Sequence, residues 1–138
     1  MKFLGCPYPI VKNPRGLLRT QNGMSQVKSD LLVLLLTQPG ERVFLPEFGT
    51  PLRDLLFEPN DSEVEERARS MIIQSISTWE PRITVDNIFI NYNIEDDLSS
   101  EDDRTESEHV LGITIRFFDP ENINEVQELR LEVPLAGG

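Results

Sequence analysis

The hydrophobic pattern of this chain changes its period at Pro81, and this change limits the possible folds more than any other feature. Proline cannot continue a helix, and it pushes the preceding residue, Glu80, into extended geometry. Before this point, a capping-box pattern at Ser62 and Glu65 opens a run of apolar residues at helical spacing. These residues are Val64, Ala68, Met71, Ile72, Ile76 and Trp79. Beyond Pro81 the period is two, so the chain is expected to pass from helix to sheet here.

Three segments after Pro81 carry apolar residues at alternate positions. They are Ile88 to Ile94, Leu111 to Phe117 and Leu129 to Leu135. This alternation is typical of strands with one buried and one solvated side, and a turn signal at residues 119–122 separates the second from the third. The pattern predicts a three-stranded antiparallel meander whose apolar face is covered by two main helices. The predicted fold class is therefore α+β.

The first half of the chain is expected to supply the other helix and an ordered loop. Residues 1–24 are rich in proline and glycine, which predicts an extended arm ahead of a single domain over residues 25–138. Ser25 is a candidate cap for a helix that ends near Thr37, because residues 38–41 favour a type II turn. A short extended piece follows at residues 42–45. In the loop at residues 46–51, Gly49 permits a positive backbone angle and Phe48 is the apolar anchor, before one or two helical turns at residues 52–57.

Charge and composition disfavour several kinds of partner, a membrane span and an internal disulfide. The net charge of -11 disfavours nonspecific binding to nucleic acid or to an anionic membrane. The longest apolar run, Leu31 to Leu36, is far below the ~18 residues that span a bilayer, and no signal-peptide core is predicted. Cys6 is the only cysteine, so no internal disulfide can form. Residues 95–108 hold eight acidic residues and one arginine, and this insert concentrates much of the negative charge.

Catalytic and metal-binding chemistry receives little support from the residue types. Glu47, Glu58 and Glu80 stand at loops or junctions where a glycosidase cleft could lie, but carboxylates are abundant and show no signature spacing. The only histidine, His109, has no nucleophile pattern beside it and is expected to be a loop residue. The acidic insert lacks the glycine and ligand spacing of a calcium loop, so a solvated connection is favoured over a cation site. We predict no enzyme activity, no cofactor and no metal.

Four ordered motifs resemble one family when they are taken together. They are Leu35 to Val43, Pro46 to Gly49, Leu52 to Pro59, and Glu80-Pro81-Arg82. At this spacing they are similar to the baseplate wedge family of contractile-tailed phages, which includes the W-type baseplate proteins and the related subunit of type VI secretion systems. The resemblance covers roughly residues 17 to 135. The acidic insert at 95–108 departs from the family pattern, and its role stays open.

The resemblance implies a structural role in a virion. A family member would stand once in each wedge and six times around the tube, link the wedge core to the first sheath ring, and initiate sheath polymerisation. Its fold would resemble the conserved domain of sheath proteins, and it would assemble in the host cytoplasm. The sheath would attach by strand addition at the edge near residues 83–94 or near residues 127–135. Tube or hub proteins are further candidate partners. The alternative is a peptidoglycan hydrolase, because the family has carried a lysozyme-like label.

The resemblance also implies which residues touch partners. Glu80, Pro81 and Arg82 match the family's Glu-Pro-Arg signature, which implies contact with the helical core bundle of the wedge. An extended backbone places the Glu80 carboxylate beside the Arg82 guanidinium, and a surface ion pair is the simpler interpretation of those two residues alone. Glu41 and Arg42 match a second family segment, where maintenance of the fold is as strong an interpretation as partner contact. The arm at residues 1–24 is expected to lie along a neighbouring protein or to order only on assembly.

Overall fold

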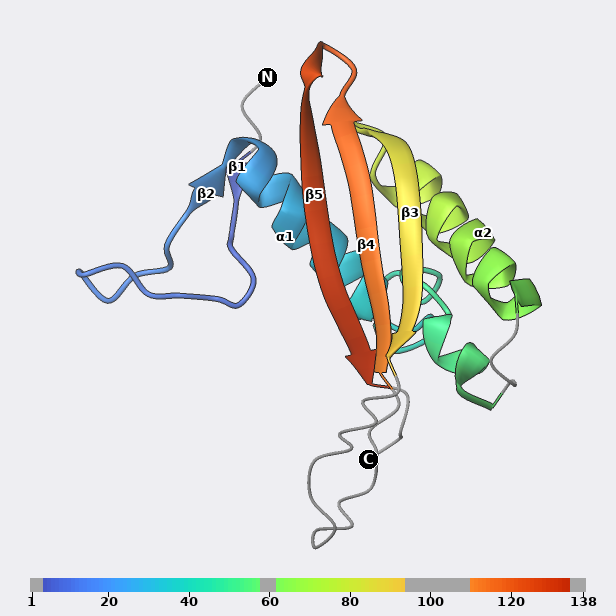
Figure 1. The fold of residues 1–138 in the computed structure, drawn as a ribbon. Coiled ribbons are helices and arrows are strands. Elements are labelled where there is room, and N and C mark those ends of the chain that lie inside the picture. Colours follow the sequence, from blue (N-terminus) through green and yellow to red (C-terminus); the bar gives the residue numbers. More distant parts are fainter. Residues whose placement is uncertain (1–3, 58–61, 94–109, 135–138) are drawn as a thin grey trace, which may run out of the picture.

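The computed structural model describes residues 4–57, 62–93 and 110–134. Two long helices lie behind one face of a three-stranded sheet, and a two-stranded ribbon lies beside the start of the first helix (Figure 1). In chain order the elements are β1 (Leu4–Gly5), β2 (Gln21–Asn22), α1 (Gly23–Leu36), the 3-10 helix η1 (Leu52–Phe57), α2 (Ser62–Trp79), β3 (Thr84–Asn93), β4 (Val110–Asp119) and β5 (Asn122–Pro134).

The sheet is an antiparallel meander in the order β3-β4-β5, which confirms the predicted α+β fold. Its register pairs Ile88 with Ile115 and Ile113 with Leu131, so alternate apolar residues of all three strands share one face. The opposite face carries polar and charged side chains as well as a few apolar ones. The change from helix to strand that the sequence predicts at Pro81 is confirmed, since α2 ends at Trp79 and β3 begins at Thr84.

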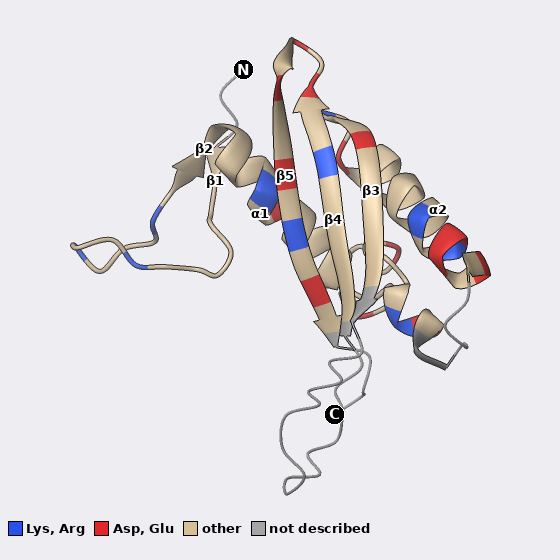
Figure 2. Ribbon diagram, viewed as in Figure 1, with Lys and Arg blue, Asp and Glu red and all other residues tan. Residues whose placement is uncertain are grey.

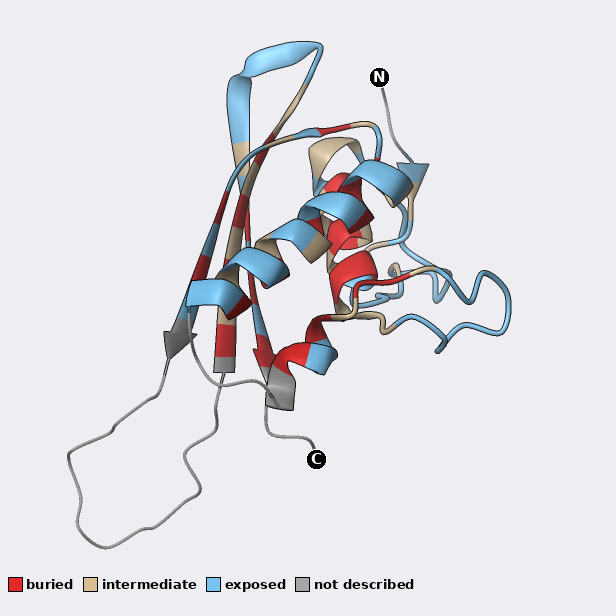
Figure 3. Ribbon diagram, turned by 90° about the vertical axis from the view of Figure 1, so that its right-hand side faces the viewer, coloured by how far each residue is buried: buried red, intermediate tan, exposed pale blue. Residues whose placement is uncertain are grey.

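The core lies between this apolar sheet face and the two helices (Figure 3). Helix α1 is buried along more than one side, as its broad apolar pattern predicts. Helix α2 buries one apolar stripe and exposes its opposite side. The far end of the β4–β5 hairpin, at residues 120–126, is exposed and extends beyond the helices (Figure 3). The main buried side chains are Val27, Leu31, Leu34, Ala68, Ile72, Ile76, Ile88, Leu111, Ile113, Ile115, Phe117, Leu129 and Leu131.

Several local predictions are wrong in detail. Helix α1 begins at Gly23 rather than after Ser25, because Gly23 accepts a φ of +66° and lets the chain turn directly from β2 into the helix. Residues 42–45 are not a continuous extended piece, because the chain bends at residues 43–44 and Leu45 has a φ of +63°. Strand β5 begins at Asn122, five residues before the predicted edge, because the backbone N–H of Glu121 donates to the Asp119 carboxylate at 2.8 Å and closes a tight turn.

The predictions for the turn at residues 38–41, for Gly49 and for residues 52–57 are confirmed. The backbone N–H of Glu41 donates to the Gln38 carbonyl at 3.1 Å and Gly40 has a φ of +94°, as a type II turn requires. Gly49 has the expected positive φ, at +129°, and residues 52–57 form the expected helical turns. The acidic insert at 95–108, Glu58 and His109 lie outside the described residues. No helix in the described part of the chain is long and apolar enough to cross a membrane.

Candidate partner-docking site

The junction between α2 and β3 holds a charged side chain inside the protein. The backbone N–H of Glu80 donates to the Ile76 carbonyl at 2.8 Å and completes the last turn of α2, after which Pro81 stops the helix. This geometry turns the Glu80 side chain inward, and the residue is only 5% exposed. A carboxylate at this depth needs a partner, because an unpaired buried charge is strongly destabilising.

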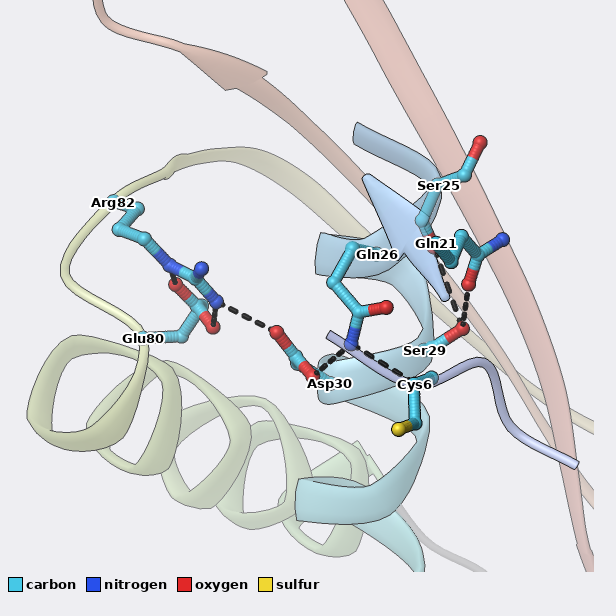
Figure 4. Close-up of polar contacts among 8 residues, drawn as sticks. All are labelled: Cys6, Gln21, Ser25, Gln26, Ser29, Asp30, Glu80 and Arg82. Carbon is cyan, nitrogen blue, oxygen red and sulfur yellow. Dashed lines mark hydrogen bonds and ion pairs between the residues drawn. The ribbon is translucent and has the colours of Figure 1, made fainter. Parts of the chain in front are cut away.

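Arg82 is that partner, and it also reaches a second carboxylate (Figure 4). Its Nε and one terminal nitrogen each donate to a different oxygen of Glu80 at 2.5 Å, in the planar fork that arginine offers to carboxylates. The same terminal nitrogen donates to Asp30 of α1 at 2.7 Å. The junction is thereby tied to α1, which lies some fifty residues earlier in the chain.

The Arg82 guanidinium is held in its charged form. The hydrogen bond to Glu80 raises the pKa of Arg82 most strongly, burial lowers it, and the hydrogen bond to Asp30 raises it again. The net effect is a pKa above the ordinary arginine value. Its contribution to stability is complete at every pH below that ordinary value and is lost only as the pH rises through the folded-state value, so this group is no physiological pH switch.

The ion pairs continue as hydrogen bonds to the N-terminal ribbon (Figure 4). The side-chain amide of Gln26 donates to Asp30 at 2.8 Å and to the backbone carbonyl of Cys6 at 3.0 Å. The Ser29 hydroxyl donates to the side-chain oxygen of Gln21 in β2 at 2.9 Å. Gln26 and Ser29 are both buried. One network therefore connects the ribbon, α1 and the junction, and no spacing rule in the sequence indicated it.

The structure corrects the expected exposure of the Glu80–Arg82 pair. The prediction placed both side chains on the surface, but Glu80 is buried and the Arg82 side chain is 33% exposed. The two side chains do meet as the sequence predicts, but Pro81 and Arg82 form a turn and not the extended backbone that was expected. Trp79, in contrast, packs against the core as expected, and its ring meets Phe48 edge-on with 5.3 Å between centroids.

Glu41 and Arg42 lie at a second site, on the loop that follows α1. The Arg42 guanidinium carbon stands 4.7 Å above the centre of the Phe48 ring, a cation–π geometry. Glu41 accepts from the backbone N–H of Gln38 at 3.1 Å and pairs with Arg53 at 3.4 Å. Both residues thus make contacts within the chain. They share with the Glu80–Arg82 junction only the packing of Phe48 on Trp79.

The most exposed side chains of this loop were not among the predicted site residues. Val43, Phe44 and Leu45 are 91%, 86% and 54% exposed. The signal that could have revealed them was present, because three consecutive apolar residues stood in a segment with no predicted helix or strand to bury them. The three carboxylates weighed for hydrolysis do not form a described cleft. Glu80 is bound to Arg82, Glu47 is exposed, and Glu58 is not described.

No three His, Cys, Asp or Glu side chains gather as metal ligands in residues 4–57, 62–93 and 110–134. The described surface offers three features that suit contact with another protein. It combines a charged guanidinium that is one-third exposed, an exposed apolar loop and a sheet with two outer strands.

Solved structures share this fold. The chain resembles a subunit of the anti-feeding prophage baseplate with a TM-score of 0.63 and 19% identity, over 97% of this chain and 86% of that one. It resembles a tail lysozyme, so described, from Geobacter sulfurreducens with a TM-score of 0.63 and 19% identity, over 83% and 92% of the two chains. A subunit of the post-contraction pyocin R2 baseplate gives a TM-score of 0.52 and 20% identity, over 91% and 97%. At these identities the likeness concerns the fold alone.

Sequence comparison gives a higher identity than these structural matches do. The chain is 30% identical over 111 residues to baseplate wedge protein gp25 of Enterobacteria phage T4, covering 80% of this chain and 75% of that protein. The sequence pattern of the family described as baseplate wedge protein gp25 matches residues 21–118, from β2 to the end of β4. The family's description names a wedge protein of a baseplate. The chain therefore belongs to the baseplate wedge protein gp25 family.

Proposed function

We propose that this chain is a non-enzymatic subunit of a contractile-tail baseplate that links the wedge core to the first sheath ring and initiates sheath polymerisation. The observation that carries the proposal is the three-stranded sheet, in which β3 and β5 each have a single neighbouring strand among the described residues. An outer strand offers a row of backbone donors and acceptors to an extended segment of another chain. In a member of a baseplate family, such an edge is a natural attachment point for the sheath.

Strand β5 is the better acceptor of the two outer strands. It is 13 residues long and pairs with β4 in unbroken register from Val126 to Pro134. Strand β3 is shorter and has a register shift between Val85 and Asn87, and such bulges interrupt edge pairing. Charged residues also alternate along β5, at Glu128, Arg130 and Glu132 (Figure 2). Charges of this kind protect a free edge from aggregation before its partner arrives.

The Glu80-Pro81-Arg82 junction is the proposed contact with the wedge core. Arg82 is one-third exposed, and its ion pairs with Glu80 and Asp30 fix the orientation of its guanidinium. A preoriented guanidinium binds a carboxylate or carbonyl with little loss of side-chain entropy. Glu80 and Pro81 would then position Arg82 rather than touch the partner themselves. Six such subunits around the tube of a virion would connect six wedges to one sheath ring.

Backbone amide exchange tests the strand-addition step. The purified chain is mixed with the sheath subunit from the same gene cluster, and protection is mapped by residue. We expect new protection in β5 and none in β3. Protection in β3 alone would assign the other edge, and protection in neither strand would contradict strand addition.

A matched arginine pair tests the wedge contact. Arg82→Lys keeps the charge but removes the planar fork, so wedge assembly should weaken while the thermal melt stays close to that of the parent chain. Arg116→Lys, on the outer face of β4, is the control and should assemble normally. Full assembly by both variants would contradict the docking role. Clearing of peptidoglycan by the purified chain, lost in Glu47→Gln, would instead support a hydrolase.

A further inference from the structure

We propose that Val43, Phe44 and Leu45 form an apolar knob that inserts into a pocket of apolar side chains on a neighbouring baseplate protein. This interaction surface is separate from both the sheet edge and the Glu80–Arg82 junction. It rests on the proposed function only in so far as the neighbour belongs to the baseplate.

The first argument is the high exposure of these apolar side chains. Val43 is 91% exposed and Phe44 is 86% exposed, the two highest values among the large apolar residues in the described part of the chain. Three consecutive apolar side chains at the tip of one loop form a patch of the kind that marks interaction sites. An aromatic residue flanked by aliphatic ones is also the composition of energetically dominant interface anchors.

The second argument is that the loop is closed and supported. The backbone N–H of Gly40 donates to the Pro46 carbonyl at 2.7 Å, which joins the two ends of the loop. The N–H of Phe48 donates to the Leu45 carbonyl at 3.1 Å. The cation–π contact of Arg42 with Phe48 fixes the base of the loop on α2 through Trp79. A knob that is already shaped loses little conformational entropy on binding.

The third argument is the backbone of Leu45. Its φ is +63°, in the left-handed region that only glycine and asparagine adopt readily. Among the described residues it is the sole non-glycine residue with a positive φ. Local strain of this kind persists where the surrounding structure imposes it, and it is concentrated at functional sites. Here it lies at the last residue of the knob, directly after the highly exposed Val43 and Phe44.

The charge of the chain and the lining of its described groove indicate which kind of partner binds the knob. Within residues 4–57, 62–93 and 110–134, the groove of about 590 Å³ on the outer sheet face is a poor pocket for the knob of a second copy, because it is largely lined by polar and charged side chains. The lining residues are Phe89, Asn91, Thr114, Arg116, Val126, Glu128 and Arg130. An anionic membrane is disfavoured by the net charge of -11 and by the exposed Glu47 beside the knob. An apolar pocket on a different protein is the remaining match for a convex apolar tip.

The test measures binding of this chain to a wedge complex that is purified without it from the same gene cluster. Phe44→Asp should weaken binding about tenfold or more, since it removes an aromatic anchor and places a charge in the pocket. Phe44→Leu should retain most of the affinity. Ile73→Asp is the control, because Ile73 is an exposed apolar residue at 46% on the outer side of α2. All variants should melt at the parent temperature.

A photo-crosslinking phenylalanine analogue at position 44 should attach to apolar residues of one wedge protein. Unchanged binding by Phe44→Asp would overturn the knob while leaving the proposed function intact. Absence of any binding by the parent chain would overturn both. Binding of the parent chain to phosphatidylcholine or anionic vesicles, or its self-association, would also overturn the proposal if Phe44→Asp abolished it.

Discussion

The Glu80–Arg82 junction and the knob loop at residues 40–46 use their side chains in opposite ways, although both rest on the contact between Phe48 and Trp79. At the junction, charged groups are drawn inward and bound by other groups of the same chain. At the loop, polar groups and backbone hydrogen bonds close the base while the apolar side chains face the solvent. Exposing apolar side chains to water in this way is unfavourable in free energy, and contact with another protein would offset that loss.

The difference separates residues that support a surface from residues that form it. Glu80 and Glu41 stabilise local geometry, and each has its partner within the chain. Arg82 does both, because it binds two carboxylates and remains one-third exposed. Phe44 makes little contact with its own chain. Measurements of stability and of binding should therefore give different rankings of these residues.

The largest expected effect on stability is at Gly49, at the base of the knob loop. A Cβ there would lie 2.4 Å from the Thr37 carbonyl oxygen, and the φ of +129° is strained for any other residue. Gly49→Ala should lower the free energy of unfolding by about 3 kcal/mol, measured by urea denaturation. Gly40→Ala is the matched control, because its φ is +94° but its Cβ would meet no atom within 4 Å. It should cost about 1 kcal/mol, and equal effects would contradict the steric argument.

The next effect contrasts the two regions directly. Arg82→Ala leaves the buried Glu80 carboxylate without its guanidinium and should cost about 2 kcal/mol, less than a fully buried pair because Arg82 is partly solvated. Phe44→Ala should change the free energy of unfolding by no more than about 0.5 kcal/mol. The double variant Glu80→Ala with Arg82→Ala should be no less stable than Arg82→Ala alone, since it removes the orphaned charge. An equal loss of stability in Phe44→Ala would break the contrast.

The sequence predicted those parts of the molecule that depend on regular periodicity. Helix α2 and the buried faces of β4 and β5 follow from apolar residues spaced 3.6 or two apart, and the turn at Gly40 follows from its proline and glycine. The bond from Arg82 to Asp30 of α1 could not be predicted, because it depends on where α1 lies after folding. The match of four motifs indicated the family, but motif spacing contains no information on exposure. It therefore drew attention to Glu41 and Arg42 and not to Phe44.

A smaller effect should reveal how far the junction network extends. Gln26→Ala removes the donors to Asp30 and to the Cys6 carbonyl, and should cost about 1 kcal/mol in global stability. Its clearer signature is local, because amides of the β1–β2 ribbon should exchange faster with solvent. Gln74→Ala, at an exposed position of α2, is the control and should leave ribbon exchange unchanged. Unchanged ribbon exchange in Gln26→Ala would confine the network to the helices.

The smallest effect should have the opposite sign. Leu45→Asn places a residue that tolerates left-handed geometry at a φ of +63°, so the isolated chain should become more stable by about 0.5 kcal/mol. The gain is small because Leu45 is only half-buried and loses some packing when it is replaced. The same variant should bind the wedge complex more weakly, since the knob loses one of its three apolar side chains. A substitution that stabilises the monomer and weakens the complex would show that the strain serves assembly. A loss of stability would show instead that Leu45 is held in place by packing within its own chain.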